Sequence, residues 1–257
     1  MSAPVFLAES TDLAAYREGD TYYLDGAEGR HAGVVQRRSV GEAIDIVDGH
    51  GARLSCTITH VSGEHLDLLV TSVSHESCGQ YRLTLVQALA KGDRDELAIE
   101  AATEVGVDRV IPWQADRSIV VWRGARAAKS HARWVATVRS AMKQARRARL
   151  PMVEQPVTSQ QLVDVIAETT QTGGVVYVLH ESATTALTSQ PRPPGGEELA
   201  PVDVVVVVGP EGGISDSELE KFTAAGAQAV LLGPHVLRTS TAGPVALALL
   251  SASTGRW

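Results

Sequence analysis

The residues best suited to chemistry in this chain lie in two glycine loops of its C-terminal half. Residues Val204–Gly213 read VVVVVGPEGG, and residues Leu231–Pro244 read LLGPHVLRTSTAGP. Each loop follows an apolar run that stops at Gly-Pro, which is typical of a strand buried on both faces of a parallel sheet. Glycine lets the backbone turn sharply and approach a ligand closely. Two such loops at neighbouring strand ends predict a pocket built mainly from backbone.

The glycine loops differ from the common nucleotide-binding patterns. GPEGGI is not G-x-G-x-x-G, and no G-x-x-x-x-G-K-[ST] segment occurs in the chain. The sequence therefore disfavours NAD and ATP as ligands. The two cysteines, Cys56 and Cys78, fit neither a disulfide framework nor a zinc spacing. The sequence therefore predicts no metal site and two inert thiols in a reducing compartment.

The elements that must position these loops alternate between strand-like and helical patterns from Tyr81 onward. Such alternation predicts a parallel α/β sheet, whose ligands bind beyond the carboxyl ends of the strands. Ser215, with Glu218 three residues later, predicts a capping box, and Gly226 the end of that helix. The other expected elements are strands within 83–90, 108–113, 175–180 and 229–233, and helices within 95–105 and 130–147, around 162–166, and from about 241.

The N-terminal 73 residues have a different pattern. Segments such as TYYLDG, RLSCTITHV and HLDLLVTSV alternate apolar and polar residues. Asp48-Gly49 and Ser62-Gly63 predict hairpin connections between short strands. We therefore expect a small, mostly antiparallel barrel, separated from the α/β part by the polar connector Ser74–Gln80.

Charge is distributed unevenly along the 257 residues. The net charge of −7 argues against a nucleic-acid partner, but the window Arg117–Arg149 holds eight arginines, two lysines and no acidic residue. A basic region within an acidic protein is typical of a surface that binds a polyanion such as RNA. The alternative is a helix face that is merely exposed to solvent. The first residues, MSAPVFLAES, do not resemble a signal peptide, and no segment has the roughly 20 apolar residues of a membrane span, so we expect a cytoplasmic protein.

Four segments occur in an order and spacing that resemble a known family. They are LVQALAKGDRDELAIEAATEVGVDRVIPW, ARWVATVRSAMKQARRARLP, VVVVVGPEGGISDSELE and LLGPHVLRTSTA. Together they resemble the RsmE family of small-subunit (16S) ribosomal RNA uridine-N3 methyltransferases, within the SPOUT superfamily. The resemblance covers nearly the whole chain, and the last two segments are its most specific part.

The resemblance implies an α/β fold in two domains. Residues 1–73 would form a PUA-like RNA-binding β-barrel, and residues 80–257 a trefoil-knotted SPOUT methyltransferase domain. It further implies S-adenosylmethionine as methyl donor and a homodimer formed through the knotted domain. The implied partner is 16S ribosomal RNA or the assembled small ribosomal subunit, with no membrane involved.

The resemblance also implies roles for individual residues. Arg238 is the leading catalytic candidate, because a cation would stabilise the charge that develops on uracil as N3 loses its proton. The alternative is a structural arginine that bonds loop carbonyls. Glu211, the second candidate, would either brace its loop or contact substrate. The residues expected to bind the donor lie in three loops: Leu179, His180, Glu181, Gly209, Pro210, Gly212, Gly213, Ile214, Leu232, Gly233, Val236, Leu237, Thr239 and Ser240.

A third set of residues is expected to meet RNA. These residues are His31, Arg37, Arg117, Arg139, Lys143, Gln144, Arg146 and Arg147. The chain departs from the family pattern at Gln36, Ala101, His235 and Ser240, and these departures concern RNA contact more than donor binding. Two other functions stay open: a SPOUT methyltransferase acting on another RNA, and a non-catalytic RNA-binding protein of ribosome assembly.

Overall fold

The chain forms two compact units in the computed structural model, which describes residues 3–8, 12–197 and 200–257. One unit comprises 1–77 and 142–150, and the other comprises 78–141 and 151–257. The segment 142–150 was expected in the second domain. It belongs to the first unit because Met142, Ala148 and Leu150 pack against Val5 and Val47.

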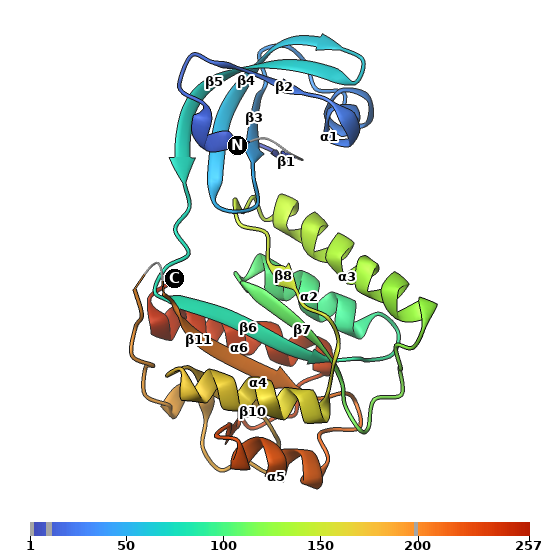
Figure 1. Cartoon of the computed structure of the whole chain (residues 1–257), viewed down its shortest axis with the longest axis vertical. Helices are drawn as coiled ribbons and strands as arrows, with labels where there is room; N and C mark the ends of the chain where they lie inside the picture. The colour runs from blue at the N-terminus through green and yellow to red at the C-terminus, as the bar shows by residue number, and fades with distance from the viewer. Residues whose placement is uncertain (1–2, 9–11, 198–199) are drawn as a thin grey trace. The chain divides into compact units, whose positions relative to one another are not determined.

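The first unit is built on a five-stranded sheet with the order β1-β3-β4-β5-β2 (Figure 1). β1 runs parallel to β3, and the remaining pairs are antiparallel, as expected from the alternating pattern. The two predicted turns connect neighbouring strands, Asp48-Gly49 between β3 and β4 and Ser62-Gly63 between β4 and β5. The strands are β1 (Val5–Leu7), β2 (Thr21–Leu24), β3 (Ala43–Val47), β4 (Ala52–Ser62) and β5 (His65–His75).

A short helix that the sequence pattern did not predict separates β2 from β3. It begins as α1 (Gly26–Arg30) and continues as the π-turn η2 (His31–Val35), after an earlier 3₁₀ turn, η1 (Leu13–Ala15). Gly29 and Gly33, one turn apart, face the β4–β5 hairpin so closely that a Cβ would lie 2.1 Å from the Glu64 carbonyl oxygen and 2.2 Å from that of Gly63. Glycine is therefore required at both positions.

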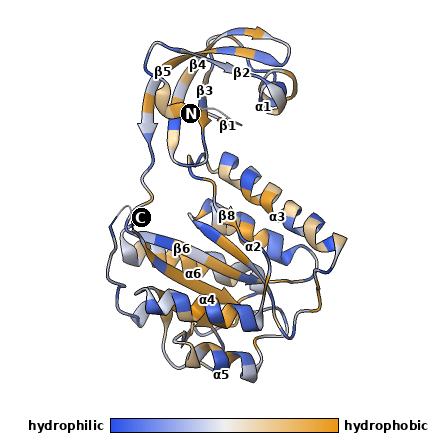
Figure 2. Ribbon diagram, viewed as in Figure 1, coloured by the Kyte–Doolittle hydropathy of each residue, from blue (hydrophilic) through white to orange (hydrophobic). Residues whose placement is uncertain are grey.

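The second unit contains a parallel sheet with the order β12-β10-β11-β6-β7-β8, and β9 also pairs with β7. Every pairing is parallel, which confirms the prediction from alternating strands and helices. Val204–Val208 lie buried in a central strand, coloured as hydrophobic in Figure 2. The strands are β6 (Tyr81–Ala88), β7 (Arg109–Gln114), β8 (Met152–Val153), β9 (Val157–Thr158), β10 (Val175–Leu179), β11 (Val202–Val208) and β12 (Gln228–Val230).

Helices cover the two faces of this sheet. α2 and α6 pack on each other and on β6. On the other face, Leu162 and Ile166 of α4 and Phe222 of α5 join a core with Val205 and Val207. The predicted capping box of Ser215 and Glu218 begins α5. The helices are α2 (Arg94–Glu104), α3 (Ala125–Gln144), α4 (Ser159–Gln171), α5 (Asp216–Ala224) and α6 (Thr239–Thr254), with the 3₁₀ turn η3 (Leu187–Ser189) before β11.

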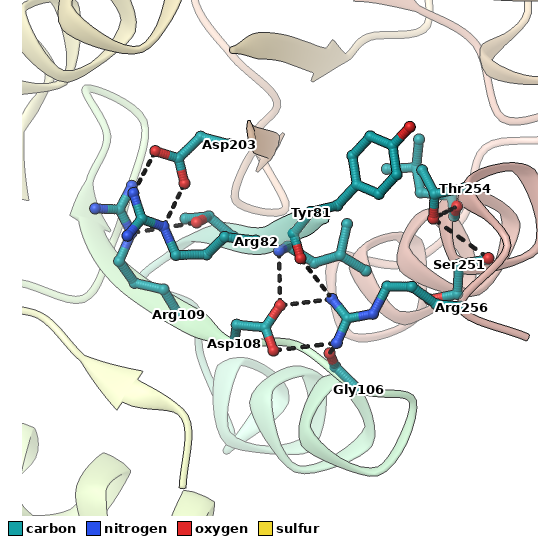
Figure 3. Close-up of polar contacts among 12 residues, drawn as sticks. Tyr81, Arg82, Gly106, Asp108, Arg109, Asp203, Ser251, Thr254 and Arg256 are labelled. Atoms are coloured by element: carbon teal, nitrogen blue, oxygen red, sulfur yellow. Dashed lines mark hydrogen bonds and ion pairs between the residues drawn. The ribbon is translucent and has the colours of Figure 1, made fainter. Parts of the chain in front are cut away.

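Ion pairs hold the amino-terminal edge of the sheet together. Arg256, just beyond α6, donates to both carboxylate oxygens of Asp108 (2.5 and 3.1 Å), and Asp108 also accepts from the Leu83 amide (Figure 3). Arg82 on β6 donates to both oxygens of Asp203 on β11. These contacts fix the amino-terminal edge, so the loops at the opposite, carboxyl edge are the ones available to bind a ligand.

Candidate active site

A cavity of about 610 Å³ lies at the carboxyl ends of β10, β11 and β12. The ends of these strands, at Leu179, Val208 and Val230, form part of its wall. Its volume is in the range of sites that take a small molecule or cofactor. The sheet edge predicted for the ligand is therefore the edge that carries this cavity.

Nearly all residues expected to bind the donor line this cavity. The exception is Ser240, which lies in the first turn of α6. Both catalytic candidates, Glu211 and Arg238, also line it, as does Arg117, which was expected to meet RNA. The lining residues that sequence reasoning missed include Arg94 and Asp216. Arg94 carried a detectable signal, because it is a cation in the KGDR turn that follows β6.

The loop Gly209–Ile214 is held from both sides by side chains. Glu211 Oε1 accepts from the Arg94 guanidinium at 2.8 Å and from the Lys91 amide at 3.2 Å. Arg117 donates to the carbonyl oxygens of Gly212 at 3.2 Å and Ile214 at 3.5 Å. Arg117 thus performs the carbonyl-bracing role that had been considered for Arg238.

The bonds to Glu211 determine its charge state. Partial burial opposes ionisation, but hydrogen bonds from its own backbone amide, from Arg94 and from the Lys91 amide outweigh it, so the pKa of Glu211 is lowered. Glu211 is therefore an ionised carboxylate that already accepts hydrogen bonds from Arg94 and the Lys91 amide. This arrangement favours a role in bracing the loop over a role in proton transfer.

A second carboxylate, Glu218, fixes the start of α5 directly behind the loop. Glu218 is buried, at 1% exposure, and accepts from the Ser159 hydroxyl at 2.6 Å, the Asp116 amide at 2.8 Å, and the Ser215 amide and hydroxyl, both at 2.9 Å. Burial raises its pKa, but these donors lower it further, so the net shift is downward. Glu218 therefore joins the turn after β7, the start of α4 and the start of α5.

Replacing Glu218 by glutamine is expected to lower the free energy of unfolding by about 2–4 kcal/mol at neutral pH, because buried donors lose a charged acceptor. Since the folded pKa lies below the unfolded value of 4.5, this stabilisation is present above pH 4.5 and is lost as pH falls through the folded pKa. Urea unfolding of both proteins between pH 7 and 3 measures the difference. A difference that stays constant over this range would contradict the charged role of Glu218.

The second glycine loop is anchored where it enters α6. The Thr239 hydroxyl donates to the Gly209 carbonyl at 2.8 Å and accepts from Gln87 Nε2 at 2.9 Å. These bonds place Arg238, the residue before Thr239, beside the ends of β6 and β11. In the part of the chain that the structure describes, the exposed Arg238 side chain has no hydrogen-bond or ion-pair partner. The alternative that Arg238 bonds loop carbonyls therefore finds no support.

The third loop follows β10 and pairs with the end of β12. The Leu231 amide donates to the Thr185 carbonyl at 2.9 Å, and the Leu187 amide donates to the Leu231 carbonyl at 2.7 Å. His180 bonds its neighbour Ser182, with 2.7 Å between Nδ1 and Oγ. His180 lines the cavity, but this local bond agrees with a loop histidine.

Most of the residues expected to meet RNA lie in the first unit, and one ring connects two of them. Phe6 contacts the His31 ring edge-on at 6.0 Å between centroids, and Lys143 Nζ lies 5.3 Å from the Phe6 centroid. Lys143 is also held by Glu28 at 2.6 Å in a largely buried ion pair. Its charge is thus already neutralised, which weakens the prediction that Lys143 binds phosphate.

The other residues expected to meet RNA are divided between the two units. Arg37, Gln144, Arg146 and Arg147 belong to the first unit, whereas Arg117 and Arg139 belong to the second.

Other classes of site find little support in the described ranges. No group of three or more His, Cys, Asp or Glu side chains is placed to hold a metal there. Cys56 is a free thiol, and burial, followed by the charge of Asp45, raises the pKa of Cys56 to about 12. Cys56 is therefore a protonated, unreactive thiol, as expected. No described helix is both long enough and apolar enough to cross a bilayer.

Comparison with known proteins agrees with this geometry. The family model for the RNA methyltransferase domain matches residues 77–251. The chain is 42% identical over 239 residues to ribosomal RNA small subunit methyltransferase E of Mycobacterium bovis, covering 93% of this chain and 89% of the relative. It is 31% identical over 248 residues to the Bacillus subtilis protein of the same name, covering 92% of each.

A solved structure extends the likeness to three dimensions. The crystal structure of ribosomal RNA small subunit methyltransferase E from Neisseria gonorrhoeae, bound to S-adenosyl methionine, matches this chain with a TM-score of 0.82. The two chains are 27% identical, and the match covers 98% of each. Sequence and fold therefore agree along nearly the full length of the chain. The protein belongs to the RNA methyltransferase family, among the ribosomal RNA small subunit methyltransferases E.

Proposed function

We propose that this protein is an S-adenosylmethionine-dependent methyltransferase that methylates N3 of a uridine in 16S ribosomal RNA. The observation that carries the proposal is the cavity formed by three loops at the carboxyl ends of β10, β11 and β12, in a chain of this family. The proposed substrate would place the enzyme in the cytoplasm, on 16S ribosomal RNA or the assembled small subunit. Action on another RNA is the second candidate, since nothing in the cavity specifies which RNA supplies the uridine.

The residues around the cavity fit the methyl donor. Leu179, Val208 and Ile214 give it apolar walls, and the loop residues offer backbone groups for polar edges. A Cβ added at Gly233 would meet no atom within 4 Å, so this stretch of backbone borders open space that a ligand can fill. Leu179–Glu181, Gly209–Ile214 and Leu232–Thr239 would therefore hold the donor, whose sulfonium supplies an already activated methyl group.

The chain's own task in the reaction is positioning and electrostatic stabilisation. Uracil N3 carries a proton and becomes nucleophilic when that proton leaves, which places negative charge on the base oxygens. The guanidinium of Arg238 has no partner among the described residues, and its backbone is fixed next to Thr239, so it can stabilise this charge. Glu211 is a poor proton acceptor because Arg94 and the Lys91 amide already bind its carboxylate.

The finer features of the fold belong to the proposal as well. A trefoil knot is supported by the pairing of Leu231 with Thr185 and Leu187 and by the Thr239 bond to Gly209, which bring the chain's last segment among earlier loops. The largely antiparallel sheet of the first unit supports a PUA-like RNA-binding barrel. A homodimer through the knotted domain is supported by two exposed apolar side chains, Val236 in the cavity lining and Val245 on α6.

Arg37 and Arg146 are the strongest RNA-binding candidates in the first unit. Both have left-handed backbone, with φ of 53° and 58°, at helix ends where glycine is the usual residue. Both side chains are exposed, and neither has a partner within the described residues. Arginine costs backbone strain at these positions that glycine would avoid, which supports a binding role for the two side chains.

Arg146→Gly is expected to weaken RNA binding while raising the free energy of unfolding by about 0.5–1 kcal/mol, because glycine relieves the left-handed strain. Arg146→Ala is the matched control, since it removes the same guanidinium and keeps the strain. RNA titration and urea unfolding of both variants provide the measurement. An RNA affinity equal to that of the unmodified protein in both variants would mean that Arg146 is merely solvated.

Isothermal titration with S-adenosylmethionine tests the proposed function against a non-catalytic assembly protein. We expect saturable binding of one donor per chain, and methyl transfer when 16S ribosomal RNA or small subunits are added. Absence of donor binding by the folded protein would contradict the proposal.

A further inference from the structure

The cavity extends beyond the three loops expected to hold the donor. Those loops follow β10, β11 and β12, whereas Arg94 and Arg117, which also line the cavity, follow β6 and β7. In the sheet, β6 and β7 lie on the far side of β11 from β10 and β12. The cavity therefore has a second half, beside β6 and β7, whose lining includes these two arginines.

Arg94 is held in this second half by its local backbone and by one ion pair. Gly92 and Asp93 both have left-handed backbone, with φ of 61° and 58°, and Asp93 is a non-glycine residue under strain there. The buried Asp95 carboxylate accepts from the Glu96 amide at 2.9 Å, which secures the start of α2. Arg94 is the residue of α2 that lines the cavity, so the turn 92–95 determines where this side chain enters the cavity wall.

Arg94 keeps donors available for a ligand. One terminal nitrogen bonds Glu211 at 2.8 Å, and within the described ranges the guanidinium has no other partner. Its side chain is 47% exposed, as expected for a group that meets a ligand arriving from solvent rather than one enclosed by the donor loops. Arg117, the other cation that lines this half of the cavity, is also exposed.

We infer that Arg94, with Arg117, binds a backbone phosphate of the RNA next to the target uridine, and that Glu211 is the positioning residue that orients Arg94. The inference rests on the proposed function and names the half of the site that receives RNA. A planar guanidinium with free donors matches phosphate oxygens, which can accept two parallel hydrogen bonds. Arg238 lies between the two halves, because Thr239 bonds both Gly209 after β11 and Gln87 of β6.

The first test measures binding of a 16S ribosomal RNA transcript at several KCl concentrations, with donor titration in parallel. Arg94→Ala should weaken RNA binding about tenfold and reduce the slope of log affinity against log salt by about 0.7, the value of one single-strand phosphate. Arg94→Lys should restore the slope but not the full affinity, since lysine lacks the planar fork. Donor affinity should stay within about twofold in both variants, because the Lys91 amide and Arg117 still hold the loop Gly209–Ile214. Lys221→Ala, an exposed cation of α5 away from the cavity, is the matched control and should change neither quantity.

The second test examines Glu211 by single-turnover methylation. Glu211→Gln should keep the salt slope and slow transfer, because Arg94 retains its charge but loses its orientation. In the Arg94→Ala background the same change should have no further effect, as expected for two residues that act as a unit. Equal slowing in both backgrounds would overturn the positioning role.

The outcomes separate this inference from the proposed function. Weakened donor binding with unchanged RNA binding in Arg94→Ala would make Arg94 a brace of the donor loop, and unchanged binding of both would leave it without a role in binding either. Either result overturns the inference while the unmodified protein still methylates RNA. Failure of the unmodified protein to bind donor would instead contradict the proposed function.

Discussion

Arg238→Ala should fold, bind S-adenosylmethionine within a few fold of the unmodified protein, and transfer methyl groups about 10²–10³ times more slowly. The loss is the usual cost of removing one preorganised donor that stabilises developing charge. Arg238 meets the structural conditions for that role: it lines the cavity, its backbone is fixed by the neighbouring Thr239, and no described residue pairs with its guanidinium. Charge develops on uracil only during transfer, so the rate should fall far more than the affinity.

The measurement is single-turnover methylation with saturating RNA, together with donor titration. Arg238→Lys is the matched variant and should recover part of the rate, because it keeps the positive charge without the planar guanidinium. Near-normal transfer by Arg238→Ala would move the catalytic role to another residue. Loss of donor binding alone would make Arg238 a part of the donor pocket.

Gly233→Val should weaken donor binding about 100-fold while leaving the fold intact. An added Cβ at Gly233 meets no atom within 4 Å, and its φ lies outside the left-handed region, so the variant protein has room for the side chain. The same side chain would occupy space that the donor must fill. Overpacking of this kind costs about 3 kcal/mol, which corresponds to about 100-fold in Kd.

Gly233→Ala provides a graded control, because its single methyl group should weaken binding less than valine does. Gly212→Val is a less clear test, since its Cβ would lie 3.2 Å from that of Arg117 and disturb the bracing of the loop. Thermal melting checks the fold of each variant, and isothermal titration measures donor affinity. Undiminished donor binding by folded Gly233→Val would remove the loop Leu232–Thr239 from the donor site.

The sequence predicted the parallel sheet and its ligand-binding edge because both follow from local pattern. The run Val204–Val208 is apolar at every position, as a strand covered on both faces requires, and Gly-Pro marks its end. The Ser215–Glu218 capping box was readable from spacing alone. Both glycine loops border one cavity because the carboxyl ends of parallel strands share one edge.

The features that were missed depend on contacts between distant segments. Periodicity placed Met142 on a helix face but could not show that this end of α3 packs against Val5 and Val47 of the first unit. The charge count placed Lys143 among the candidate phosphate ligands but could not show its ion pair with Glu28, which is far away in sequence. Arg94 was missed because its place in the KGDR turn shows a cation near the end of β6 but not its ion pair with Glu211, which is distant in sequence.

The most direct test of the central claim is to map N3-methyluridine in ribosomal RNA from cells with and without the gene. The account predicts that one 16S uridine loses its N3-methyl group in the deletion strain. The unmodified gene should restore this methyl group, and the Arg238→Ala gene should not. Unchanged 16S methylation, together with a methyl group missing from transfer RNA or large-subunit RNA, would contradict the proposed substrate.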